Sequence, residues 1–345
     1  MQSRWARVQL VRFLVFCVLA AVVVVGLLAL QPPRASISVL CSNNPQSCQA
    51  LAETFEWETG HRVQMIRLPT SQAHARLRLN TSAPEFDVWM GGPAESYVVG
   101  ADEGLFDTVG DLAAVAELPP ELRDGGGYWA GIYGGILSLC INTDRLGSRP
   151  VPDSWQGLLD PELTGEVLAP HPLLSGTAAT MLTVQYGRLG SLEATIDYLR
   201  ALENQLLGYL DSGTDVARNV ARGSATVGIS FAPYCEAERA AGYPVTSVFP
   251  REGTGYEVGA IALLAHAANP EIARLFIDFV VSAPGQRLSS SMASQLATSP
   301  EVSPNLVGAL DELTVPLVAS DRTEAARLRP LLINLWAKQV RHGIY

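Results

Sequence analysis

Short turns of serine, glycine and threonine are the residues of this chain whose types and positions best suit ligand chemistry. The clearest is Ser175-Gly176-Thr177, which lies between an apolar run ending at Ala169 and a segment with helical spacing. Ser175 is placed to cap that helix, so the first free backbone N–H groups fall on Gly176 and Thr177. Such groups, together with the helix dipole, favour negative charge. Taken alone, the stretch is better explained as an ordinary helix cap.

Similar turns recur at strand-to-helix junctions along the chain. They are Ser42-Asn43, Thr70-Ser71, Ser175-Gly176-Thr177 and Ser212-Gly213-Thr214. One such turn indicates a cap, but four of them spread over two lobes would line a single cleft with neutral donors suited to an oxyanion. As a set, the turns favour a binding site for a small anion.

Enzyme signatures are missing from the sequence. It contains neither a Gly-x-Ser-x-Gly elbow nor a His-Glu-x-x-His pair, and no Cys-x-x-Cys pair supports redox chemistry or thiolate zinc. Lys338 is the single lysine, which excludes a P-loop mechanism. The five histidines are scattered, at His61, His74, His171, His266 and His342. We therefore predict no catalytic residue, no cofactor and no resident metal.

Composition places the chain among globular proteins. Its 345 residues are 48% hydrophobic and 17% charged, which is enough for two lobes with separate cores. The formal net charge of -10 argues against a nucleic-acid partner, although a single pocket can still be positive.

The N-terminus contains an unbroken apolar run over residues 13–30. Arg4, Arg7 and Arg12 precede it without any acidic residue, and its length matches a bilayer. By the positive-inside rule the rest of the chain is exported. We expect residues 1–35 to be a retained membrane anchor, with a cleaved signal peptide as the close alternative.

Export permits disulfides. Cys41 and Cys48 flank a predicted strand end and the first turn of a helix, so a short bridge between them is expected. Cys140 and Cys235 either pair or remain buried thiols, and nothing local decides between these. Cys17 lies in the apolar run and is expected to be inert.

Strand and helix patterns alternate over the first part of the chain. Strands are predicted at residues 36–40, 61–66 and 86–90, and helices at 45–59, where Asn44-Pro45 starts and Gly60 ends the helix, and at 73–80. This order predicts an α/β fold with a parallel sheet and right-handed crossovers. Ligands of such sheets bind beyond the carboxyl ends of the strands.

The apolar segment 131–141 and the prolines near residue 150 are interpreted as the crossing into a second lobe. There we expect helices over 192–206, 215–222 and 236–241 and strands over 207–210, 225–231 and 245–249. The chain then returns through 252–257 into a strand at 258–264, followed by a helix from Asn269-Pro270 and a mostly helical tail. The predicted domains are 36–140 (lobe one), 141–250 (lobe two), and 251–345 (return to lobe one and C-terminal helices).

The motifs, in this order, resemble the exported solute-binding subunits of ABC importers, in the ferric-iron, hexose-phosphate and 2-aminoethylphosphonate group of the type II periplasmic-binding-protein fold. Short matches cover about residues 36 to 290. They are Cys41-Ser42 with Cys48, 55–60, 87–89, Gly91-Gly92-Pro93, 128–131, Tyr133, Asn142-Thr143, Ser154-Trp155, 158–161, Gly165-Glu166, 175–178, 212–214, 221–223, 228–231, Phe249-Pro250 and 252–257.

The resemblance implies a two-lobed clamp that closes on its ligand by hinge bending and then docks on a membrane permease. It also implies site residues, to which the turn residue Asn43 and the alternative iron ligand Tyr234 are added. They are Ser42, Asn43, Thr70, Ser71 and Gly92 from lobe one, Ser175, Gly176, Thr177, Ser212, Thr214 and Tyr234 from lobe two, and Glu257 on the returning strand. A carboxylate at Glu257 suits sugar hydroxyls rather than phosphate.

Two departures from the family concern the ligand. Ferric-binding relatives carry adjacent tyrosines where this chain has Ala232-Pro233-Tyr234, and often a Glu at the position of Gln72, whereas Fe(III) needs anionic oxygen donors. Sugar-phosphate relatives carry His-Asp at the positions of Pro233 and Tyr234. We therefore expect a periplasmic or outer-face protein that captures a small anionic solute, a phosphorylated or phosphonate compound. The alternatives are ferric iron held by Tyr234, or a sensor that signals to a membrane partner.

Overall fold

The computed structural model describes residues 35–318 and 322–341, and the described residues from Ser36 onward form one compact unit. The predicted anchor or signal segment, with its run over 13–30 and Cys17, lies outside the described residues, as does His342. Within the described part of the chain, no helix has the length and apolar character needed to cross a membrane.

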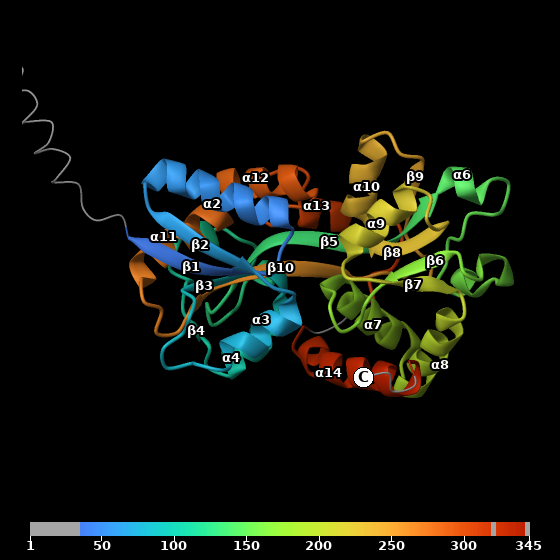
Figure 1. Cartoon of the computed structure of the whole chain (residues 1–345), viewed down its shortest axis with the longest axis horizontal. Helices are drawn as coiled ribbons and strands as arrows, with labels where there is room; N and C mark the ends of the chain where they lie inside the picture. The colour runs from blue at the N-terminus through green and yellow to red at the C-terminus, as the bar shows by residue number, and fades with distance from the viewer. Residues whose placement is uncertain (1–34, 319–321, 342–345) are drawn as a thin grey trace, which may run out of the picture. The chain divides into compact units, whose positions relative to one another are not determined.

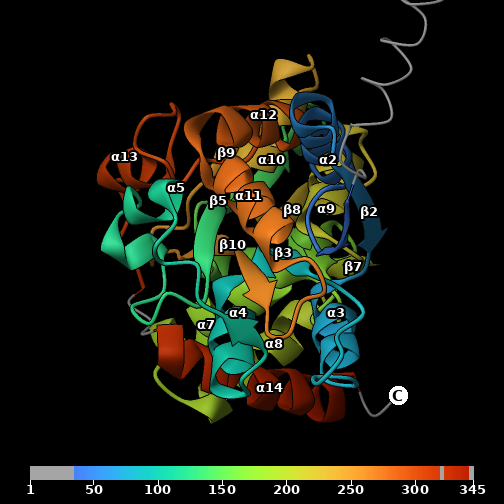
Figure 2. The same ribbon diagram turned by 90° about the vertical axis from the view of Figure 1, so that its left-hand side faces the viewer.

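The first half of the sheet has the predicted alternation. Strand β1 (Ser36–Cys41) pairs in parallel with β2 (Arg62–Arg67) and with β3 (Val88–Pro93). The connecting helices are α2 (Pro45–Thr59) and α3 (Thr70–Leu77), and α4 (Ala94–Asp102) follows β3. Figure 2 shows α2 and α12 on one face of these strands and α3 and α4 on the other.

The boundaries of α2 follow the predicted signals. The Asn44 side chain accepts hydrogen bonds from the backbone N–H groups of Gln46 and Ser47, and Gly60 ends the helix in the left-handed conformation. Helix α3 starts at Thr70, three residues earlier than predicted. The reason is that Pro69 takes the N-cap position and the polar residues after it form the first turn.

Two long strands continue the sheet and join its halves. The strand order is β2-β1-β3-β10-β5-β8-β6-β7, with β4 (Phe106–Asp107) paired to β10 and β9 (Val245–Val248) paired to β5. Residues 130–136 of β5 (Ala130–Asn142) pair antiparallel with β10 (Tyr256–Leu264), whereas residues 137–142 pair with β8 (Val227–Phe231) and β9. The predicted crossing therefore occurs inside β5, at the centre of Figure 1.

The second half repeats the α/β alternation. β6 (Val167–Pro170) lies parallel to β7 (Leu206–Leu210) and β8, and the helices are α6 (Thr143–Leu146), α7 (Gly176–Leu189), α8 (Leu192–Glu203), α9 (Gly213–Ala221) and α10 (Ala232–Ala240). Helix α10 begins directly after β8, earlier than predicted, since Pro233 suits a first helical turn. Short elements are α5 (Ala113–Ala116) and the 3-10 helices Pro120–Leu122, Gln156–Leu159 and Pro161–Leu163.

The C-terminal part supplies α11 (Pro270–Val281), α12 (Ala283–Ala293), α13 (Leu306–Asp311) and α14 (Arg322–Gln339). Phe276 of α11 packs edge-on against Phe55 of α2 in the core of the first half. Leu332 and Trp336 of α14 instead belong to the core of the second half. The limits of the two predicted lobes, 140/141 and 250/251, stay a proposal. Helix α14 packs on α4 of the first half and on α7 and α8 of the second.

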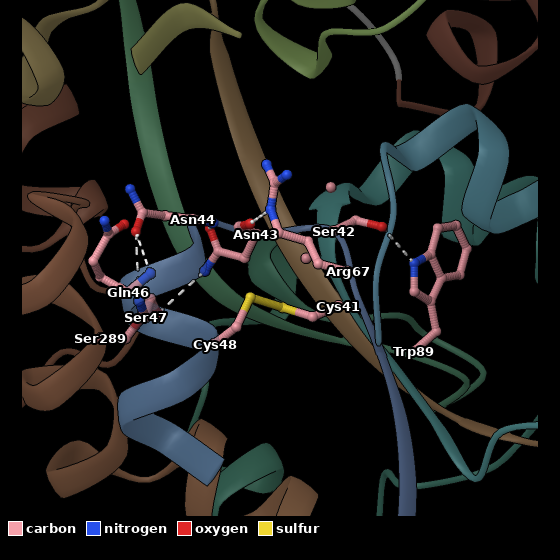
Figure 3. The surroundings of a disulfide bond; sticks show 12 residues. Cys41, Ser42, Asn43, Asn44, Gln46, Ser47, Cys48, Arg67, Trp89 and Ser289 are labelled. Carbon is pink, nitrogen blue, oxygen red and sulfur yellow. Dashed lines mark hydrogen bonds between the residues drawn. A yellow bond between two sulfur atoms is a disulfide. The ribbon is translucent and has the colours of Figure 1, made fainter. Parts of the chain in front are cut away.

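Both described cysteine pairs form disulfides. The predicted bridge joins Cys41 at the end of β1 to Cys48 in α2, and Figure 3 shows it beneath the turn Ser42-Asn43-Asn44. Cys140 and Cys235, which the sequence left open, are also bonded and attach α10 to β5. Each bridge therefore lies directly beside a turn or helix that carries candidate site residues.

Candidate ligand-binding site

A cavity of about 360 Å³ lies between the halves of the sheet, where β1, β2 and β3 end and α7 and α9 begin. Eleven of the twelve predicted site residues line it: Ser42, Asn43, Thr70, Gly92, Ser175, Gly176, Thr177, Ser212, Thr214, Tyr234 and Glu257. Ser71 lies outside the cavity, and its hydroxyl donates to the carbonyl of Leu173 at 2.9 Å. Four turns that are far apart in the sequence thus meet at one place.

Helix α7 brings its N-terminus to the cavity. Ser175 occupies the N-cap position as predicted, but its side chain forms no capping hydrogen bond with the described backbone, so that expectation was wrong in its detail. Ser175 and Thr177 are 4% and 5% exposed. A Cβ atom on Gly213, the first residue of α9, would lie only 2.5 Å from the Thr177 hydroxyl. The first turns of α7 and α9 are therefore in contact.

The N-cap residue of α9, Ser212, already uses its hydroxyl in hydrogen bonds within the helix. The Ser212 hydroxyl accepts from the backbone N–H of Asp215 at 3.1 Å and donates to the Asp215 carboxylate at 2.6 Å. The same carboxylate accepts from Arg218 at 3.3 Å, so much of the Arg218 charge is already compensated. Thr214 is the neighbouring hydroxyl that remains on the cavity wall.

In the first half, two glycines with positive φ angles lie near the end of β3, with φ of 87° at Gly91 and 80° at Gly92. A Cβ atom on Gly92 would lie 2.5 Å from the Thr70 hydroxyl, so only glycine fits there. The Gly92 N–H donates to the Tyr133 hydroxyl at 3.0 Å, and this hydroxyl donates to Oε1 of Glu257 at 3.4 Å. The strand end is thus linked to the acidic residue.

Glu257 is the buried acid of the cavity and is 4% exposed. Burial and the nearby Glu95 carboxylate raise its pKa to about 8, against the opposing effects of Arg329 and of the Tyr133 hydrogen bond. Its Oε2 atom has no hydrogen-bond partner among the described residues. The side chain is therefore largely uncharged at pH 7, with one polar atom free for a ligand.

Arg67 is a site residue that the sequence reasoning missed. It is the last residue of β2, lines the cavity, and donates from Nε to the backbone carbonyl of Asn43 at 2.9 Å. In Figure 3 its two terminal nitrogens point away from that carbonyl, and no described residue hydrogen-bonds to them. The signal that could have found Arg67 is its place at a strand end just before the predicted turn Thr70-Ser71, whereas Tyr133 lies inside β5 and Arg218 inside α9, where no local pattern marks them.

A family model described as bacterial extracellular solute-binding protein matches residues 84–312. The chain belongs to this family. An uncharacterized protein of Haemophilus influenzae is 32% identical to this solute-binding protein over 322 residues, covering 89% of this chain and 91% of that protein. The Fe(3+)-binding periplasmic protein of Serratia marcescens is 23% identical over 288 residues, covering 81% and 83%.

Solved structures agree with the predicted fold class. The periplasmic binding protein AfuA of Actinobacillus pleuropneumoniae, with exogenous fructose-6-phosphate bound, has a TM-score of 0.80 at 30% identity and covers 90% of this chain and 100% of its own. The periplasmic binding protein P5PA has a TM-score of 0.80 at 26% identity, covering 89% and 99%. Iron-bound HitA of Pseudomonas aeruginosa, at 19% identity, TM-score 0.74 and coverage of 87% and 98%, shares the fold. The two-lobed periplasmic-binding-protein fold and the role in solute capture are thus confirmed.

Tyr234 is the candidate iron ligand of this solute-binding protein. Burial of its hydroxyl and the nearby Glu257 raise its pKa, which keeps the phenol neutral. Among the residues that the structure describes, no group of three or more His, Cys, Asp or Glu side chains is arranged to hold a metal ion. The cavity wall consists mainly of hydroxyls, backbone groups and side-chain amides, with the arginines Arg67 and Arg218, the carboxylates Asp211 and Asp215, and the buried acid Glu257.

Proposed function

We propose that this solute-binding protein captures a small phosphorylated sugar or phosphonate outside the cytoplasm and delivers it to the permease of an ABC importer. The observation that supports this most is the meeting of the α7 and α9 N-termini with Arg67 at one cavity. Helix N-termini and arginine are the protein groups that bind oxyanions best. The neighbour AfuA, whose structure contains fructose-6-phosphate, supports the same ligand class.

The body of the ligand would carry hydroxyl groups. Because Oε1 of Glu257 accepts from Tyr133, the proton of the neutral carboxyl group lies on Oε2, beside the first turn of α7. This group can donate to a ligand oxygen, and a ligand that leaves it unpaired loses about 1–3 kcal/mol. A sugar phosphate can supply a hydroxyl oxygen for Glu257 and an oxyanion for the helix N-termini and Arg67, so we favour a ligand that has both an oxyanion and a hydroxylated end.

Capture would work by differential binding. The cavity takes Thr70 and Gly92 from one half and Thr177 and Thr214 from the other, so the closed state gains contacts from both halves and the open state from one. Strands β5 and β10 lie where the two halves of the sheet join, so they would act as the hinge for this motion.

A thermal-shift screen of the full chain in mild detergent tests the proposal. The additives are inorganic phosphate, fructose 6-phosphate, 2-aminoethylphosphonate and Fe(III) citrate, each at several concentrations. A ligand at about 100 times its Kd stabilises a protein by about 2.7 kcal/mol, which gives a clear rise in Tm. We expect this for fructose 6-phosphate or the phosphonate. A flat response to all three anions would contradict the proposal.

Ferric iron remains the second candidate, because Tyr234 lines the cavity and a curated relative is an Fe(3+)-binding protein. Iron would have to remove the Tyr234 proton against the burial that raises its pKa. A tyrosinate-to-iron absorption band on adding Fe(III) citrate would favour it over the anion. The membrane anchor and the alternative sensor role stay predictions from the sequence.

A further inference from the structure

A network of polar side chains crosses the cavity wall between the two halves. It consists of Asn43 and Gln295 from the first half and Tyr234 from the second. Asn43 is 4% exposed and Gln295 is 3% exposed. Gln295 follows the end of α12 and does not line the ligand cavity, whereas the other two do.

We propose that Gln295 is a positioning residue that fixes the Tyr234 hydroxyl as a hydrogen-bond donor toward the ligand, so that the site selects an oxyanion. This inference rests on the proposed function. The donor of each hydrogen bond in the network can be assigned by starting from a backbone N–H group, which can only donate.

The backbone N–H of Asn44 donates to Oδ1 of Asn43 at 2.7 Å. Because a backbone N–H can only donate, this contact fixes which end of the Asn43 amide is the oxygen. The Nδ2 end then donates to the Gln295 oxygen at 3.2 Å and faces the Ser47 hydroxyl at 3.4 Å. The start of α2 thus determines the orientation of the Asn43 side chain.

The orientation of Gln295 follows. The atom 2.7 Å from Oδ1 of Asn43 must be a donor, which makes it the nitrogen Nε2. The same nitrogen lies 3.3 Å from the Tyr234 hydroxyl, so its second hydrogen points to the phenol oxygen. Tyr234 therefore receives a hydrogen bond from Gln295 and has no acceptor there for its own proton.

The Tyr234 hydroxyl group belongs to a side chain that lines the ligand cavity. Because its oxygen accepts from Gln295, its own hydrogen must point elsewhere, and a ligand in the cavity can receive it. Tyr234 thus presents a donor to a bound oxyanion, and a cation would meet that hydrogen.

Gln295→Glu tests this with little change of shape. The oxygen that replaces Nε2 has at most one hydrogen, which Asn43 takes, so this oxygen can only accept from Tyr234. The free donor is then lost in either protonation state of the introduced carboxyl group. We expect the Kd for fructose 6-phosphate, measured by calorimetry on the full chain, to rise at least about 10-fold.

A double-mutant cycle with Tyr234→Phe separates this role from a structural one. The Tyr234→Phe background has no phenol hydrogen whose direction Gln295→Glu could change, so Gln295→Glu should change the Kd by no more than about 3-fold. Gln46→Glu is the matched control, since it adds the same charge to an exposed cavity residue away from Tyr234. It should have equal effects in both backgrounds.

Equal effects of Gln295→Glu in both backgrounds would overturn the inference. If Gln295→Glu does not fold, as judged by its Tm and circular dichroism, Gln295→Met removes the Nε2 donor that orients the Tyr234 hydroxyl without adding a charge. The Kd should then rise in the wild-type background and stay unchanged in the Tyr234→Phe background. A wild-type chain that binds none of fructose 6-phosphate, 2-aminoethylphosphonate and inorganic phosphate would instead contradict the proposed function. The two failures are therefore distinguishable.

Discussion

Gly176, the first residue of α7, lies directly against the carboxyl group of Glu257, so that a Cβ atom at Gly176 would be 2.6 Å from Oε2. This contact joins the second half of the fold to β10 at the inner wall of the cavity. It also places the free backbone N–H groups of a helix start beside a buried acid with an unsatisfied oxygen. Donors for an anion and a neutral carboxyl group that can bind a ligand hydroxyl are thus adjacent.

Gly176→Ala should therefore weaken binding. The added methyl group must displace Glu257 or shift α7, and we expect the Kd for fructose 6-phosphate to rise about 10-fold or more. Gly208→Ala is the control in the same half, since nothing lies within 4 Å of its Cβ position. Unchanged affinity in Gly176→Ala would show that this contact does not shape the site.

The raised pKa of Glu257 predicts that the free energy of unfolding depends on pH. Its pKa of about 8 in the folded state exceeds the ordinary value of 4.5, so folding favours the protonated form. This destabilising contribution is absent below pH 4.5, grows as the pH rises toward 8, and is constant above it. Glu257→Gln removes it, so the Tm of the variant relative to wild type should increase from pH 5 to pH 8.5.

Thermal unfolding at pH 5, 7 and 8.5 measures this difference. The control is Glu58→Gln, which makes the same chemical change at an exposed position of α2. A Glu257→Gln difference that does not change with pH would show that the carboxyl group is not protonated by folding.

The two disulfides should contribute unequally to stability. They close loops with sequence separations of 7 for Cys41–Cys48 and 95 for Cys140–Cys235. By chain entropy alone, the short bridge stabilises by about 2 to 3 kcal/mol and the long one by about 4 to 5 kcal/mol. Replacing each pair by alanine and measuring denaturant unfolding should give the larger loss for Cys140 and Cys235, and a reversed order would contradict this.

Much of the fold could be predicted because its signals are local. Asn44-Pro45 and Gly60 marked the ends of α2, and β1, β2 and β3 alternate with helices as parallel strands require. The meeting of four Ser/Gly/Thr turns at one cavity followed from the rule that ligands bind at strand ends. Ser71 is the exception, because α3 already starts at Thr70, so Ser71 lies within the first turn of the helix and its hydroxyl donates to the carbonyl of Leu173.

The rest depends on contacts between distant residues. Gln295 and Asn43 are 252 positions apart, so no local pattern joins them. The packing of Trp336 in the second core likewise requires the whole chain, because α14 reaches that core from the far end of the sequence. Arg67 was missed for another reason: it lies in a strand pattern, and its role emerges only when the neighbouring turn folds beside it.

Arg67 yields a prediction about charge. Its Nε is held by the Asn43 carbonyl, which aims the remaining guanidinium nitrogens without neutralising them. A hydrogen bond between ionised groups contributes about 1.5–3 kcal/mol, so Arg67→Gln should raise the Kd for fructose 6-phosphate about 10- to 100-fold. It should also flatten the dependence of the Kd on salt, since screening acts on the lost charge pair. Arg62→Gln, at the exposed start of the same strand, should change neither quantity, and an equal effect of both variants would point to net charge alone.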